Sequence, residues 1–138
     1  MTTTTFLAGA LNVYLGEIFG SNENKHPLLF MNLSQKTKYN LRKLGESLKK
    51  EQKTVIDQLI EIRKNYIETV VEDDKKVEKV IVGKEDEFMK VTKELEVVEI
   101  QIEHPDFQEK DFIDKTTGEI VGSELYYNII DKLIYEKE

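Results

Sequence analysis

The feature that most constrains this chain is an apolar stripe at helical spacing along residues 34–72. The stripe consists of Leu41, Leu44, Leu48, Val55, Leu59, Ile62 and Tyr66. No proline lies in this segment and no glycine follows Gly45 there, so we predict one long amphipathic helix over residues 34–72 with Ser34 as its N-cap. Such a face has to be buried, and the helix therefore organises the domain around itself.

Shorter elements are predicted on both sides of this helix. An N-terminal helix is expected within residues 1–20, with its apolar side between positions 6 and 19 and the preceding threonine run as a capping signal. β-Branched or alternating segments predict strands at residues 77–82, 96–103 and 119–121, which we expect to form one small sheet. Residues 85–94 are expected to be helical. A final helix should begin at Ser123, and its apolar side is Leu125, Ile129, Ile130, Leu133 and Ile134.

These elements predict an α+β fold in a single domain of residues 1–138. The domain is expected to comprise the N-terminal helix (1–20), the long helix (34–72) and an acidic α+β half (75–138). The absence of cysteine excludes disulfides and thiolate metal sites. No apolar run approaches the roughly 20 residues of a membrane span, and no basic residue precedes Phe6 as it would in a signal peptide. We therefore expect a cytoplasmic protein that does not enter a membrane.

The net charge of −7 conceals two segments of opposite sign. Residues 35–53 hold seven Lys/Arg against two Glu, which gives +5, and residues 85–138 hold sixteen Asp/Glu against six Lys, which gives −10. Three interpretations stay open: solvated helix faces, a nucleic-acid contact by the basic segment, or an acidic surface that imitates nucleic acid or docks on a basic partner. Because the whole chain repels phosphate, we do not expect nucleic acid to be the main partner.

Residues that would form a known catalytic site are missing from the sequence. The glycines are scattered and form no phosphate-binding loop, and there is no thiol nucleophile. His26 and His104 each lie beside a proline in a predicted loop. We therefore expect a protein that is not an enzyme and that uses neither a cofactor nor a metal.

The order of several segments resembles a family of small tailed-bacteriophage proteins of unknown function. The resemblance covers roughly residues 28–134 and rests on pattern more than on invariant residues. It begins with Leu28-Leu29-Phe30 and continues with Gln35-Lys36-Thr37-Lys38-Tyr39-Asn40 at the start of a long charged helix, which carries Leu44, Leu48 and Glu51 before Tyr66. An acidic linker, Phe88 to Leu95, Val98-Glu99-Ile100, a Pro-Asp-Phe turn and a final helix ending at Leu133-Ile134 follow. The resemblance implies a phage protein without catalytic residues, located in the cytoplasm of the bacterial host or in the virion.

Two functions are consistent with these features. The first is an accessory protein that binds a host or phage protein, for instance to inhibit a host defence or nucleic-acid enzyme. The second is a virion or assembly component, such as a connector, neck or chaperone-like protein, in which copies of the chain associate with one another. The predicted partner-binding residues are Lys36, Lys38, Arg42, Lys43, Lys49, Lys50, Phe107, Phe112 and Tyr127.

Overall fold

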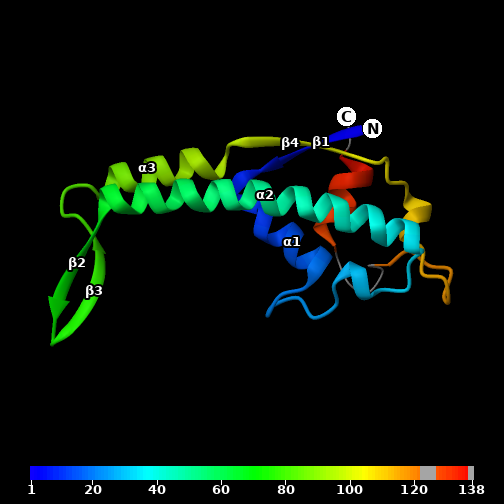
Figure 1. Cartoon of the computed structure of the whole chain (residues 1–138), viewed down its shortest axis with the longest axis horizontal. Helices are drawn as coiled ribbons and strands as arrows, with labels where there is room; N and C mark the ends of the chain where they lie inside the picture. Colours follow the sequence, from blue (N-terminus) through cyan, green and yellow to red (C-terminus); the bar gives the residue numbers. More distant parts are fainter. Residues whose placement is uncertain (122–126, 137–138) are drawn as a thin grey trace.

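Helix α2, Gln35–Tyr66, runs along the length of the molecule and carries the other elements (Figure 1). A computed structural model of the chain describes residues 1–121 and 127–136. The 32 residues of α2 span about 48 Å at the usual helical rise of about 1.5 Å per residue. We call residues 55–97 the arm and the other described residues the head. The α+β fold predicted from the sequence is confirmed.

The head contains an antiparallel ribbon of two strands that lies on α2. Strand β1, Thr2–Leu7, pairs with β4, Glu99–His104, so that Thr2 lies opposite His104 and Phe6 opposite Ile100. The inner face of the ribbon is buried and is formed by Thr4, Phe6, Ile100, Ile102 and His104. The alternation predicted for β4 is therefore confirmed, except that Val98 precedes the strand and is exposed.

Helix α1, Leu11–Phe19, packs on the first half of α2 at very short range. Leu41, Leu44 and Leu48 are fully buried below it. At Gly45, a Cβ atom would lie 2.4 Å from a ring carbon of Phe19. Only a residue without a side chain allows the aromatic ring to lie this close to the backbone of α2.

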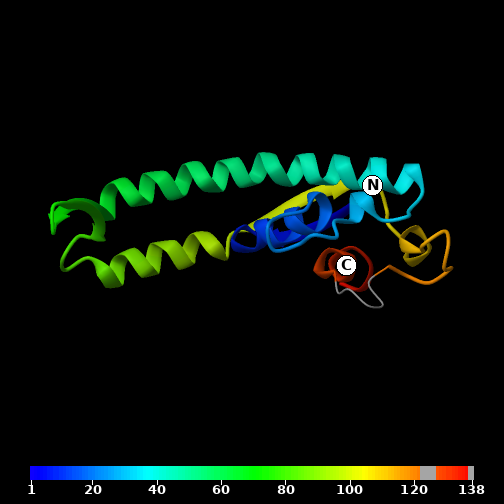
Figure 2. The same ribbon diagram turned by 90° about the horizontal axis from the view of Figure 1, so that it is seen from below.

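The C-terminal helix covers the opposite side of α1. It consists of α4, Asn128–Ile130, and the π-helical turn Asp131–Tyr135. Its buried residues include Ile129, Ile130 and Leu133, as the sequence predicted. In Figure 2, α1 and the ribbon form a layer between α2 and this helix. The predicted cap Ser123 and Leu125 lie outside the described residues.

The arm is thin because it consists of two helices and a hairpin. Helix α3, Glu85–Glu96, lies beside the second half of α2 (Figure 2) and has no fully buried residue. The rings of Tyr66 and Phe88 lie 6.0 Å apart and connect the two helices. Ser34 caps α2 at the other end, because its hydroxyl oxygen accepts a hydrogen bond from the Thr37 backbone N–H at 3.1 Å.

The predicted end of the long helix was wrong by six residues. Residues 67–72 form strand β2, Ile67–Glu72, which pairs with β3, Lys75–Val80. Asp73 and Asp74 connect the strands with φ angles of 49° and 63°. Both angles are positive, as in the tight turns that match the twist of a two-stranded hairpin. The β-branched run after Tyr66 favours extended backbone and ends the helix there.

Two further predictions of secondary structure were also wrong. The segment 1–20 is helical only from Leu11 to Phe19, since the threonine run forms strand β1 instead of a cap. The three predicted strands do not share a sheet, because β3 pairs within the arm and β4 pairs with β1. Residues 119–121 contribute a single bridge between Ile120 and Ile113.

We predict that Leu48→Asp abolishes cooperative unfolding, whereas Leu59→Asp leaves the melt of the head in place. Leu48 is fully buried, and an unpaired charge there costs several kcal/mol, while Leu59 is only half-buried on the arm. Circular dichroism melts and hydrogen exchange measure both effects. Lys50→Asp is the matched control, because it places the same carboxylate at an exposed position of α2. A cooperative wild-type melt in Leu48→Asp would contradict this assignment of the core.

Candidate functional site

The basic residues predicted to contact a partner lie on α2 and point away from the core. Lys36, Arg42, Lys43, Lys49 and Lys50 are exposed, and Lys38 is half-buried. The salt bridges within residues 1–121 and 127–136 join Arg63 to Glu78, Lys79 to Glu72, and Lys132 to Glu136. None of them involves the cations of residues 35–53. We call the four cations between residues 36 and 43 the basic ridge. The role of the ridge in binding stays a prediction.

The three aromatic residues predicted to contact a partner are instead in the core. Phe107 and Phe112 are fully buried, with ring centroids 5.8 Å apart. Tyr127 is buried as well, and its hydroxyl donates a hydrogen bond to the backbone oxygen of His26 at 2.6 Å. The prediction was wrong because large aromatic side chains contribute most when they are removed from water, and this small head uses them for its own stability.

Two hollows lie along α2, one beside the head and one beside the hairpin. At the head end, Val55, Ile56 and Leu59 line a hollow of about 170 Å³ together with residues of the 3-10 turn Ala8–Ala10, of α1 and of α3, where Leu95 and Glu96 contribute. At the hairpin end, Ile60 lines a second hollow of about 250 Å³. Ile56 and Ile60 lie one turn apart on the same face of α2, and their exposed fractions are 46% and 47%. We call this surface the α2 trough.

The head forms one wall of the trough and the hairpin forms the other. Asn12 of α1 stands at the head end, where it accepts a hydrogen bond from the Gln52 side chain. Ile67 and Thr69 of β2 stand at the hairpin end. Because residues of a strand alternate between faces, Val71 is on the same face as Thr69, and it is 71% exposed. Figure 1 shows α1 and the hairpin extending to the same side of α2.

The trough continues the face of α2 against which α1 packs. Gly45 and Ile56 are eleven residues apart, which places them within about 20° of one another around a helix of 3.6 residues per turn. Near Gly45 this face is covered by α1. At Ile56 and Ile60 the same face is uncovered within the described residues, because α1 begins at Leu11 and runs away from the arm.

The outer rim of the trough carries two lysines, with the exposed carboxylate of Asp57 between them along the helix. Lys53 precedes Ile56 by three residues, and Lys64 comes four residues after Ile60. At these spacings each lysine lies next to its isoleucine on the helix surface. Both lysines are exposed, and neither takes part in a salt bridge among the described residues. On the inner side, Arg63 is neutralised by Glu78, with 2.5 Å between Nη2 and Oε2.

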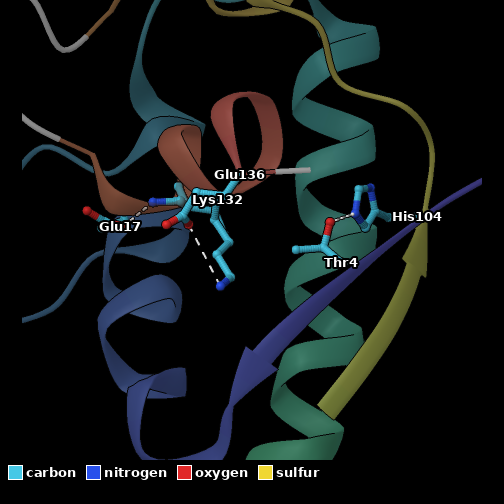
Figure 3. Close-up of polar contacts among 6 residues, drawn as sticks. Thr4, Glu17, His104, Lys132 and Glu136 are labelled. Carbon is cyan, nitrogen blue, oxygen red and sulfur yellow. Dashed lines mark hydrogen bonds and ion pairs between the residues drawn. The ribbon is translucent and has the colours of Figure 1, made fainter. Parts of the chain in front are cut away.

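Glu17 is a buried carboxylate whose role is structural (Figure 3). Its Oε2 accepts a hydrogen bond from the Asn128 backbone N–H at 2.6 Å, and its Oε1 accepts one from the Ile129 backbone N–H at 2.8 Å. The Glu17 side chain, which belongs to α1, therefore caps the beginning of the C-terminal helix. Burial raises the pKa of Glu17, and the bonds from Asn128 and Ile129 oppose this shift.

His104 is also buried and has partners on both ring nitrogens. Figure 3 shows its contact with Thr4. Nδ1 donates to the Pro105 backbone oxygen at 2.8 Å, because that oxygen can only accept. Nε2 lies 2.6 Å from the Thr4 hydroxyl, which connects the two strands of the ribbon. The predicted loop position was wrong, since His104 is the last residue of β4. With both nitrogens engaged, the ring supports the ribbon and leaves no nitrogen for a ligand.

The described part of the chain contains neither a metal-binding cluster nor a membrane-spanning helix. Within residues 1–121 and 127–136, no three His, Asp or Glu side chains gather as they would around a metal ion. No described helix combines the length and the apolar character needed to cross a membrane.

Comparison of the chain with models of known families, with curated proteins and with solved structures found no match.

The dominant apolar stripe of α2 does not predict the α2 trough, because the trough lies on another face of the helix. Ile56 and Ile60 are four residues apart and lie about 100° away from the Val55 and Leu59 positions around the helix. They form a second, shorter apolar stripe. A search for two faces on one helix would have found it.

We predict that Glu17→Gln changes how stability depends on pH. Because the folded-state pKa of Glu17 is raised above its usual 4.5, its contribution to stability is full below about pH 4.5 and is lost as pH rises through the folded-state pKa. Wild type should therefore lose stability relative to Glu17→Gln as pH rises from about 4 to about 7. Denaturant unfolding of both proteins across this range measures the difference, and a constant gap or a gap of opposite slope would contradict it.

Proposed function

We propose that this chain is a non-enzymatic accessory protein of a tailed bacteriophage and that it acts by binding a host or phage protein in the α2 trough. The phage setting is an expectation from the resemblance of residues 28–134. The binding role has a separate support in the surface itself. One observation carries it: Ile56 and Ile60 are half-exposed on a helix face that continues an internal packing surface.

Single exposed apolar residues are ordinary in proteins, but this arrangement is different. Ile56 lines the hollow beside the head, Ile60 and Ile67 line the hollow beside the hairpin, and Val71 is exposed further along the same strand face. Apolar surface of this kind costs free energy when it is left in water. A partner that covers it recovers that free energy, and residues at the centre of a covered surface contribute most to affinity.

Binding at the trough provides a direct route to inhibition of a host enzyme. The first turn of α3 presents three exposed carboxylates, Glu85, Asp86 and Glu87. A partner held in the trough therefore lies on an arm that also carries a concentrated negative charge, which repels other anions such as nucleic acid. In this proposal the arm blocks the partner through occupancy and charge without any chemical step.

Capture from host cells tests the proposal. We predict that tagged wild-type protein captures a specific partner from infected cells and that Ile56→Ser with Ile60→Ser lowers the capture at least tenfold. The matched control is Leu7→Ser with Val13→Ser, which removes two apolar residues of comparable exposure, 42% and 49%, from the head. Circular dichroism verifies that all three proteins are folded. Equal capture by the trough variant, or no specific capture by wild type, would contradict the proposal.

A second candidate function, a virion or assembly component, is favoured by the separation of charge along the molecule. The basic ridge lies on the head end of α2, and the acidic first turn of α3 lies near the hairpin. Surfaces of opposite sign at different places allow head-to-tail contacts between copies. Mass spectrometry of purified virions separates the two functions, since an assembly component is present at a fixed copy number and an accessory protein is absent.

A further inference from the structure

We propose that the occupant of the α2 trough is an amphipathic α-helix whose apolar side is flanked by acidic residues. The inference rests on the proposed function, because it names the partner chemistry of the same surface. It is carried by three features of the trough: the face of α2 on which it lies, its length and the charge of its rim.

The face of α2 indicates that the occupant is a helix. Near Gly45, this face already binds a helix, α1, whose Phe19 ring lies against the backbone. Ile56 and Ile60 present the same face about three to four turns further along, and they have the one-turn spacing that interdigitates with residues of a second helix. From Lys49 to Lys64 the face is about 22 Å long, which corresponds to a helix of about four turns. Peptide helices bind such grooves through apolar residues spaced three and four apart.

The rim indicates that the flanking residues of the occupant are acidic. Lys53 and Lys64 are exposed and lie directly beside the isoleucine floor, while Lys49 lies over the Phe19 ring at the head end, 4.0 Å from its centroid. None of the three lysines has a salt-bridge partner among the described residues. Carboxylates on the rim of an occupant would pair with these lysines, and lysines there would be repelled.

The same charges disfavour a second copy of this chain as the occupant. If two α2 helices packed antiparallel over the isoleucines, Lys53 of each copy would lie near Lys64 of the other. If they packed parallel, each lysine would lie near its own equivalent. Either arrangement brings like charges together at the border of the contact, which costs affinity. An acidic partner helix avoids this cost.

Synthetic peptides test the inference on the full chain. Two 18-residue peptides share the same leucines at helical spacing and carry either glutamates or lysines at the flanking positions. A third peptide is the glutamate peptide with two central prolines, which break the helix. Fluorescence anisotropy measures the Kd of each peptide for wild type. We expect the glutamate peptide to bind at least fivefold more tightly than the lysine peptide at low salt, with a smaller difference at about 0.5 M salt, and the proline peptide not to bind.

Protein variants locate the peptide on the trough. Ile56→Ser with Ile60→Ser should weaken the glutamate peptide at least tenfold. Lys53→Gln with Lys64→Gln should bring the two peptides within twofold of each other. The matched control is Lys36→Gln with Lys43→Gln, which removes two lysines from the basic ridge and should leave the affinity unchanged.

The outcomes separate this inference from the proposed function. The inference is overturned if the glutamate peptide does not bind, if the lysine peptide binds equally well, or if the ridge variant loses binding instead of the trough variants. Binding of the proline peptide as tightly as the helical one would overturn the helical part. In each case, loss of the captured protein in Ile56→Ser with Ile60→Ser would still support the trough as the binding surface of the proposed function.

Discussion

The burial of Leu41, Leu44 and Leu48 beneath α1 and the two-stranded ribbon is the interaction on which the rest of the structure depends. It fixes the first half of α2 in a complete core. The second half has only α3 beside it, and α3 buries no residue fully. A helix that is already nucleated extends at little further cost, so the head maintains an arm that its own contacts hold only weakly. The trough exists because this arm extends beyond the elements that cover α2 in the head.

Local patterns predicted the helices well and the strand pairing poorly. The stripe of α2, its Ser34 cap and the alternation of Ile100 and Ile102 are properties of short segments, and the structure confirms them. The partner of β4 is β1, and the paired residues Thr2 and His104 are 102 positions apart in the sequence. Periodicity contains no information about such a distant partner. For the same reason the threonine run was predicted as a cap, although its β-branched residues suit a strand equally.

The candidate site was predictable in its charge and not in its apolar part. Except for the half-buried Lys38, the lysines of the basic ridge are exposed, as expected for side chains that are costly to bury. Phe107, Phe112 and Tyr127 became core residues, since a head of this size needs its aromatic side chains for its own packing. Ile56 and Ile60 were overlooked because a helix with one strong stripe was treated as having one functional face. They are exposed because α1 begins at Leu11 and runs away from this part of α2.

The uninterrupted backbone of α2 has a consequence for selectivity. The head wall at Asn12 and the hairpin wall at Thr69 are both attached to this one helix, and no proline or glycine lies between its residues 46 and 66. The distance between the two walls is therefore fixed. A bound helix that is one turn longer adds about 5.4 Å. Its end would then contact a wall before its side chains contact Ile56 and Ile60. In the proposed complex, the trough would thus select helices by their length, independently of their charge or apolar pattern.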